Sequence, residues 1–140
     1  RFEVCSKAPL VILDGAHNPH AAAALAAGTE KFLPKRRTLL CGMMADKDCA
    51  GVMSTLAPLF EHVITVPVQS PRAISPAELA ALAAPYCPNV SSAENAAEAL
   101  EKLLSTLAPD EALVVAGSLY LASELRPRLM RFKGKTEPQS

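Results

Sequence analysis

The segment at residues 10–20, LVILDGAHNPH, restricts the fold of this 140-residue chain more than any other feature. Four apolar residues suited to a buried strand end at Asp14, and a glycine and His17 precede an alanine-rich helical pattern. Asn18 can cap that helix by accepting a backbone amide, and Pro19 suits the first helical position because it has no N–H. A strand that leads through a short polar turn into a helix is typical of α/β proteins, which place ligands at such turns.

Strand patterns and helical patterns alternate along the rest of the chain. The expected strands cover residues 2–6, 10–14, 37–42, 62–67, 88–91 and 112–117. The expected helices cover residues 19–33, 48–60, 76–84, 93–107 and 118–130. Short apolar strands that alternate with helices predict a three-layer α/β fold with a mostly parallel, six-stranded sheet. Too few residues separate the first two strands for a parallel crossover, so the first is expected to be an antiparallel edge strand.

Two sequence patterns predict where helices begin, and a third predicts where the fold ends. Ser75–Glu78 and Ser91–Glu94 both have the form of a capping box. Residues 1–131 are expected to form one domain. Residues 132–140 are polar and lack periodicity, which predicts a disordered tail.

The composition excludes several classes of function. Half of the residues are apolar, and the 14 basic and 14 acidic residues cancel, so a nucleic-acid partner is not expected. No apolar run approaches the ~18 residues of a membrane span, and no signal peptide is visible. Four cysteines without a CxxC pair and three histidines argue against a structural zinc and suit a reducing cytoplasm. Cys5 and Cys41 lie in apolar runs and are expected to be buried thiols. The missing initiator Met suggests a fragment of a longer protein.

Four polar or glycine-containing turns follow expected parallel strands, and each precedes a helix pattern. They are Asp14–Asn18, Gly42–Asp48, Gln69–Arg72 and Gly117–Ser118. Turns after the carboxyl ends of parallel strands meet at one edge of the sheet. Because helix N-termini favour anions, the sequence predicts an anion-binding rim there.

Motifs in a fixed order over nearly the whole chain resemble the folylpolyglutamate synthase and dihydrofolate synthase family, a branch of the Mur ligases. They are Arg1-Phe2-Glu3, DGAHNP at 14–19, GMMADKD at 42–48, Ser70-Pro71-Arg72 and GSLY at 117–120. The resemblance is to the C-terminal domain, and it implies that family's Rossmann-like fold. Gly-Ala-His in place of Tyr-Ala-His favours the folate branch over another Mur-type ligase.

The resemblance implies ATP contacts for Arg1, Asp14, His17 and Lys47. Asp14 would accept ribose hydroxyls, although an Asp at this position also forms turns by bonding backbone amides. Arg1 would reach ATP across an interdomain hinge, or be an ordinary exposed residue. His17 would contact phosphate or substrate and is the catalytic candidate. The alternative is a histidine that is solvated or caps a helix. Lys47 would approach phosphates, or belong to a charged helix start that Asp46 or Asp48 caps.

Arg72 and Ser118 are the candidates for binding glutamate. A related Asn-Pro-Arg turn in Mur ligases that add amino acids binds the incoming amino acid, and a guanidinium pairs well with a carboxylate. Here Ser70 replaces the Asn, which leaves the role of Arg72 a hypothesis. Ser118 resembles a family serine near the glutamate site, with a simple helix cap as the alternative. His20 and His62 have no such support and are expected to be structural.

No G-x-x-x-x-G-K-[ST] loop occurs in the chain, so its residues lack the usual cradle for phosphoryl transfer. In the family, the P-loop, the Mg²⁺ ligands and a modified lysine belong to an N-terminal ATPase domain of the same polypeptide. The resemblance therefore implies part of a monomeric, cytoplasmic ligase that uses ATP to join L-glutamate to folate or dihydropteroate through an acyl phosphate. The isolated chain is expected to be inactive. A non-catalytic α/β module that binds a small anion or a partner protein is the alternative.

Overall fold

The computed structural model describes residues 2–135 and has the α/β architecture that the sequence predicts. The strands of the described region form one sheet in the order β1-β2-β6-β3-β4-β5. Their bounds are Glu3–Lys7 (β1), Leu10–Leu13 (β2), Arg37–Cys41 (β3), His62–Thr65 (β4), Val90–Ser92 (β5) and Ala112–Ala116 (β6). β1 pairs with β2 in antiparallel fashion, and the other pairings are parallel, which confirms the antiparallel edge strand.

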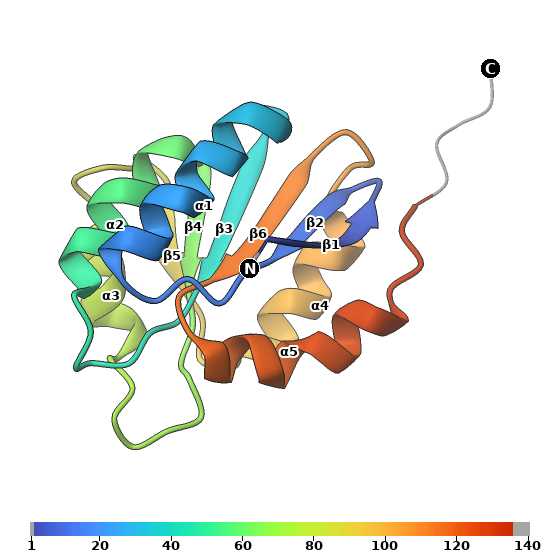
Figure 1. Ribbon diagram of the computed structural model, residues 1–140. Helices are drawn as coiled ribbons and strands as arrows, with labels where there is room; N and C mark the ends of the chain where they lie inside the picture. The colour runs from blue at the N-terminus through green and yellow to red at the C-terminus, as the bar shows by residue number, and fades with distance from the viewer. Residues whose placement is uncertain (1, 136–140) are drawn as a thin grey trace.

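Helices cover both faces of the sheet (Figure 1). They are α1 (Pro19–Phe32), α2 (Cys49–Leu56), the 3₁₀ turn η1 (Ala57–Leu59), α3 (Pro76–Ala83), α4 (Ala96–Thr106) and α5 (Leu119–Arg131). One apolar core lies under α1, α2 and α3, and a second lies under α4 and α5. Successive strand residues face opposite sides, so Val11 belongs to the second core and Ile12 to the first.

The strand order places a crevice at the carboxyl ends of the central strands. β6 lies between β2 and β3, yet the helix after β6 covers the opposite face from the helices after β2 and β3. The chains that leave these three strands therefore diverge to opposite sides of the sheet. Open α/β sheets bind ligands at such a topological switch point.

Two helix boundaries differ from the sequence predictions. The helix expected at 48–60 ends at Leu56 and continues as η1, in which Pro58 has no N–H for a further helical bond. The helix expected from residue 93 begins at Ala96, so the capping box predicted at Ser91–Glu94 is wrong. Ser91 and Ser92 lie in β5, and Asn95 caps α4 by accepting the Glu98 amide at 2.9 Å.

The first part of the expected tail, residues 132–135, lies within the described part of the chain, and two of its residues contact the fold. Phe132 packs against the second core, and the Lys135 amide donates to the Ala8 carbonyl at 2.6 Å. The ammonium of Lys135 also donates to the carbonyls of Ser105 and Leu107 at the end of α4, where a cation is favourable. The remainder of that tail, residues 136–140, lies outside the described residues.

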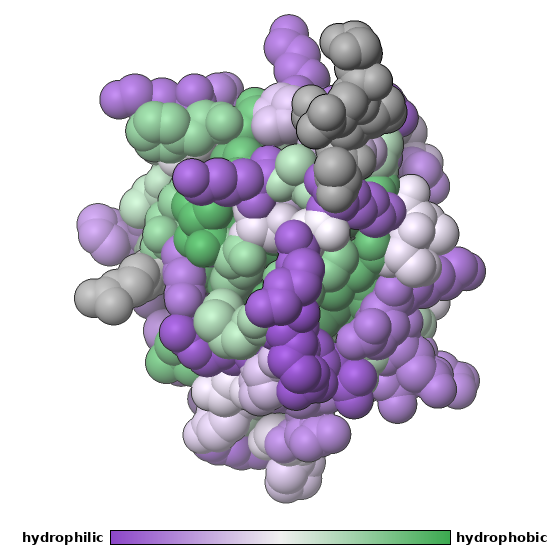
Figure 2. All heavy atoms as spheres, turned by 90° about the vertical axis from the view of Figure 1, so that its right-hand side faces the viewer, coloured by the Kyte–Doolittle hydropathy of each residue, from purple (hydrophilic) through white to green (hydrophobic). Residues whose placement is uncertain are grey.

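The surface around the end of α5 is mostly hydrophilic, and its apolar areas are small and separated (Figure 2). Within residues 2–135, no helix has both the length and the hydrophobicity that a membrane span needs. Cys41 is buried as expected, whereas Cys5 on the edge strand is only half-buried, which corrects that prediction. Both thiols are free, as are those of Cys49 and Cys87.

Candidate functional site

The turn after β2 holds Asp14 in a buried position. Its side chain is 7% exposed, and one carboxylate oxygen accepts the Ala16 amide at 2.8 Å. The Asp14 amide itself donates to the Val115 carbonyl of β6 at 2.9 Å. Asp14 is thus the turn-forming residue that the local pattern allowed, and the carboxylate is held rigidly at the strand end. It also borders a cavity of about 190 Å³ against the first half of α1.

His17 is oriented by its own turn. Its Nδ1 lies 2.8 Å from the Gly15 carbonyl oxygen. A carbonyl only accepts, so Nδ1 donates, and the neutral ring keeps Nε2 as an acceptor for another group. Asn18 then caps α1 by accepting the Ala21 amide at 2.8 Å, with Pro19 in the first turn, as predicted.

The turn after β3 settles which acidic residue caps α2. Asp48 accepts the Gly51 amide at 2.9 Å, so the cap is Asp48 and not Asp46. Lys47 precedes it with an exposed side chain, while its backbone is fixed by a 3.2 Å bond to the Met44 carbonyl. The charged helix start and an exposed ammonium at the rim are therefore both present.

The turn that contains Ser70-Pro71-Arg72 is tied to the turn after β3. The Ala45 amide donates to the Arg72 carbonyl at 2.7 Å, and Met44 forms a β-bridge with Ala73. The Ser70 hydroxyl accepts the Arg72 amide at 3.2 Å, which stiffens the turn. The Arg72 side chain is exposed and lines none of the cavities described in this section.

Ser118 caps the helix that follows β6. Its hydroxyl accepts the Tyr120 amide at 3.0 Å, and the residue is only 2% exposed. The preceding Gly117 donates its amide to the Ala16 carbonyl at 2.9 Å and has φ +112°. The turns after β2 and β6 are thus joined by a hydrogen bond, and the predicted convergence of the four turns on one rim is confirmed.

A cavity of about 110 Å³ lies where these turns meet. It brings together His17, Lys47 and Ser118, which are three of the residues singled out by the sequence. Its remaining lining residues are Met44, Leu119 and Tyr120. Sequence reasoning did not assign these last three to the site, although they lie within the matched motifs. Only the structure points to two of them, because Leu119 and Tyr120 are large hydrophobic side chains that remain exposed.

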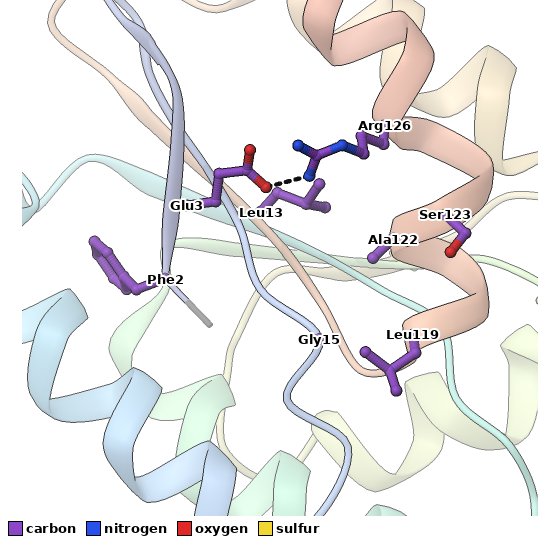
Figure 3. A pocket seen from close by; sticks show the side chains of 8 residues that line it. All are labelled: Phe2, Glu3, Leu13, Gly15, Leu119, Ala122, Ser123 and Arg126. Carbon is purple, nitrogen blue, oxygen red and sulfur yellow. Dashed lines mark hydrogen bonds and ion pairs between the residues drawn. The ribbon is translucent and has the colours of Figure 1, made fainter.

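A larger cavity of about 420 Å³ adjoins the first, on the α5 side of the β2 end. Figure 3 shows its lining: Phe2, Glu3, Leu13, Gly15, Leu119, Ala122, Ser123 and Arg126. An ion pair between the Glu3 carboxylate and the Arg126 guanidinium joins β1 to α5 across it. Leu119 belongs to both cavities. Arg1, which the resemblance assigns to ATP, lies outside the described residues.

The thiols near the rim are held in their protonated form. Burial raises the pKa of Cys41, at the end of β3, to about 12. Burial, and then the charge of Asp48, raises the pKa of Cys49 at the start of α2. Neither thiol is suited to act as a nucleophile at neutral pH. Within the described part of the chain, no three His, Cys, Asp or Glu side chains are grouped to hold a metal ion.

Comparison with known proteins gives one consistent family. The Mur ligase, glutamate ligase domain family matches residues 1–119. The chain is 36% identical over 131 residues to folylpolyglutamate synthase of Lacticaseibacillus casei. The aligned region covers 93% of this chain and 29% of that protein. The chain therefore spans about three tenths of the length of this curated relative.

Solved structures agree with this match. Escherichia coli FolC in complex with ADP superposes with a TM-score of 0.83 and 28% identity, over 92% of this chain and 31% of that one. A second match is the bifunctional folylpolyglutamate synthase/dihydrofolate synthase of Yersinia pestis, complexed with AMPPNP and Mn ion. It superposes with a TM-score of 0.81 and 27% identity, over 92% of this chain and 30% of that one. Because the family match covers most of the chain and the fold is the same, this chain belongs to the Mur ligase, glutamate ligase domain family.

Proposed function

We propose that the chain is the C-terminal domain of an ATP-dependent ligase that adds L-glutamate to folate or dihydropteroate. The observation that carries this proposal is the 110 Å³ cavity, in which His17, Lys47 and Ser118 meet at the carboxyl ends of β2, β3 and β6. Three helices begin at this rim, so backbone amides and helix dipoles add to its affinity for anions. Both a nucleotide phosphate and an amino-acid carboxylate fit this chemistry.

The nucleotide end of the site is assigned to the turn after β2. The buried carboxylate of Asp14 has the rigidity that a ribose contact requires, and His17 presents Nε2 on the same turn. Arg1 and Lys47 complete the proposed contacts. The relatives bound to ADP and to AMPPNP with Mn ion support nucleotide use by this chain. We assign the Mg²⁺ ligands to the N-terminal domain of the same polypeptide.

The glutamate end is assigned to the 110 Å³ cavity. It is smaller than the ~300–1,000 Å³ of sites for drug-sized ligands, so it suits an amino acid better than a pterin or a nucleotide. Ser118 lines this cavity and is the proposed contact for glutamate there, and His17, the catalytic candidate, supplies an acceptor for a proton of the incoming amine. Arg72 lies on the adjoining turn and would bind a glutamate carboxylate only if its exposed side chain swings toward the rim.

The proposed chemistry uses these residues for positioning. When bound, ATP supplies the phosphoryl group that activates a substrate carboxylate as an acyl phosphate. The rim then holds the glutamate amine near that carbonyl, and domain closure excludes the water that would hydrolyse the activated acid. Since half of this site belongs to the other domain, the chain alone binds nucleotide weakly and has no turnover. The parent is proposed to be a monomeric enzyme of the cytoplasm.

The test uses the full-length parent protein. ADP formation is measured with L-glutamate and either dihydropteroate or tetrahydrofolate, and it should require both substrates. His17→Ala should lower kcat/KM by about 100-fold, the scale of a lost acid–base or orienting group. His20→Ala is the matched control, since His20 is exposed on α1 and lines none of these cavities, and it should retain activity. Equal activity of the two variants, or tight nucleotide binding by the isolated chain, would contradict the proposal.

A further inference from the structure

Leu119 stands between the two cavities at the rim. It lines both the 110 Å³ cavity with His17 and Lys47 and the 420 Å³ cavity with Glu3 and Arg126. Figure 3 shows its side chain on the first turn of α5, directed toward the backbone of Gly15. At 62% exposure it is an apolar residue that the core does not require. It lies at the boundary that the two cavities share.

The side chain of Leu119 packs on Gly15. A Cβ atom built on Gly15 would stand 2.4 Å from Leu119 Cδ2, closer than real carbon atoms approach. The absence of a side chain at residue 15 thus lets Leu119 lie directly on the turn that carries Asp14 and His17. The same turn is joined to the start of α5 through the Gly117–Ala16 hydrogen bond. Leu119 consequently packs against the backbone of the site.

We propose that Leu119 is a specificity-determining residue that sets the length of the amino acid accepted by the smaller cavity. This inference rests on the proposed function, which places the incoming L-glutamate in that cavity. The branched side chain closes the end that faces the larger cavity, so a longer amino acid meets Leu119 before its amine reaches the reactive position. Shortening residue 119 opens the smaller cavity into the larger one.

The larger cavity can receive what the smaller one excludes. Its Arg126 guanidinium is half-exposed and uses one nitrogen for Glu3, so other N–H groups remain for a carboxylate. An acidic amino acid with an additional methylene group would therefore find both space and a charge partner beyond residue 119. L-2-Aminoadipate, which is one methylene longer than L-glutamate, is the direct probe of this prediction.

The test compares L-glutamate and L-2-aminoadipate as substrates of the full-length parent and of its Leu119→Ala variant. The ratio of the two kcat/KM values should shift toward L-2-aminoadipate by about 10-fold or more, which is the scale of one methylene in a fitted pocket. Leu119→Met restores bulk and should return the ratio toward that of the wild type. Met130→Ala is the control, because it shortens another exposed apolar residue of α5 at the end far from the site.

The outcomes separate this inference from the function on which it rests. Glutamate ligation by the wild type with an unchanged ratio in Leu119→Ala would overturn the role of Leu119 and leave the proposed function standing. The same shift of the kcat/KM ratio in Met130→Ala would also overturn the role of Leu119, since the effect would then come from the helix and not from the cavity wall. Absence of glutamate ligation by the wild type would instead contradict the proposed function.

Discussion

Gly117 and Gly42 bring the turns after β6 and β3 into direct contact. A Cβ atom on Gly117 would lie 2.5 Å from the Gly42 carbonyl oxygen and 2.7 Å from the Cys41 sulfur. With φ at +112°, residue 117 also adopts a backbone conformation that side chains disfavour. The turn after β6 can therefore pack against the backbone of the turn after β3 only because residue 117 has no side chain.

Gly117→Ala is accordingly expected to destabilise the domain. The strained φ alone costs about 1–3 kcal/mol, and the contact with a backbone carbonyl cannot be relieved by a rotamer change. Chemical denaturation of the 140-residue chain measures the effect. Gly28→Ala in α1 is the control, because the closest atoms to its new Cβ belong to the Phe2 side chain at 3.1 Å. A smaller loss of stability for Gly117→Ala than for Gly28→Ala would contradict this account of the rim.

The start of α4 gives a prediction that separates the observed cap from the expected one. Asn95→Ala removes the side chain that accepts the Glu98 amide and should lower the free energy of unfolding by about 1 kcal/mol. Ser92→Ala changes an exposed residue of β5 and should have little effect. Urea denaturation of both variants measures their free energies of unfolding and shows which residue caps the helix. A larger loss of stability for Ser92→Ala than for Asn95→Ala would contradict the assignment of Asn95 as the cap.

Cys41 predicts a pH dependence of stability. Its pKa is about 12 in the folded state and near 9 in the unfolded chain, because burial disfavours the thiolate. The folded state thus retains a proton that the unfolded state loses. The contribution is fully present below pH 9 and is lost as the pH rises from 9 toward 12, by about 1.4 kcal/mol per pH unit.

The measurement is the free energy of unfolding between pH 8 and pH 11 for the wild type and for Cys41→Ala. The alanine variant is less stable overall, since it leaves a cavity in the core, but its curve should fall less steeply with pH. Subtracting the two curves removes the titration of lysines and tyrosines. Parallel curves would show that Cys41 does not contribute.

Asp14→Asn tests the nucleotide contact in the full-length parent. Asn retains an acceptor for the Ala16 amide but loses the charge, so the fold should survive. The KM for ATP should rise by about 10-fold or more, as expected for losing hydrogen bonds to a charged group. Asp110→Asn is the control, because Asp110 lies on the surface near Arg36. An unchanged KM for ATP in Asp14→Asn would leave Asp14 a purely structural residue.

The sequence was sufficient to predict the sheet, because β2 and β6 are continuous apolar runs and helical patterns separate the parallel strands. The antiparallel edge followed from the few residues between Lys7 and Leu10, and the α1 cap followed from Asn18 and Pro19. The start of α4 was mispredicted because Ser91 and Glu94 have the spacing of a capping box, although Asn95 is the residue that caps the helix. The recruitment of Ser91 and Ser92 into β5, where Ser91 bonds His62 at 2.9 Å, depends on the neighbouring strand.

The place where the four turns converge was predicted to a similar extent, whereas the roles of the site residues stay predictions. Polar residues after strand ends could be assigned to one rim, since parallel strands share their carboxyl edge. The motifs did not reveal that Asp14 faces a different cavity from His17, nor that Leu119 divides two cavities. The position of Leu119 depends on contacts between segments about 100 residues apart, and local pattern carries no information about such contacts.

The most direct test of the central claim is mass spectrometry of the product formed by the full-length parent with ATP, L-glutamate and dihydropteroate or tetrahydrofolate. The account predicts a product heavier by one glutamyl residue, formed only when ATP is present and nearly abolished by His17→Ala. ATP-independent product, or no glutamylated product from either acceptor, would contradict the assignment of this domain to a glutamate ligase of the folate branch.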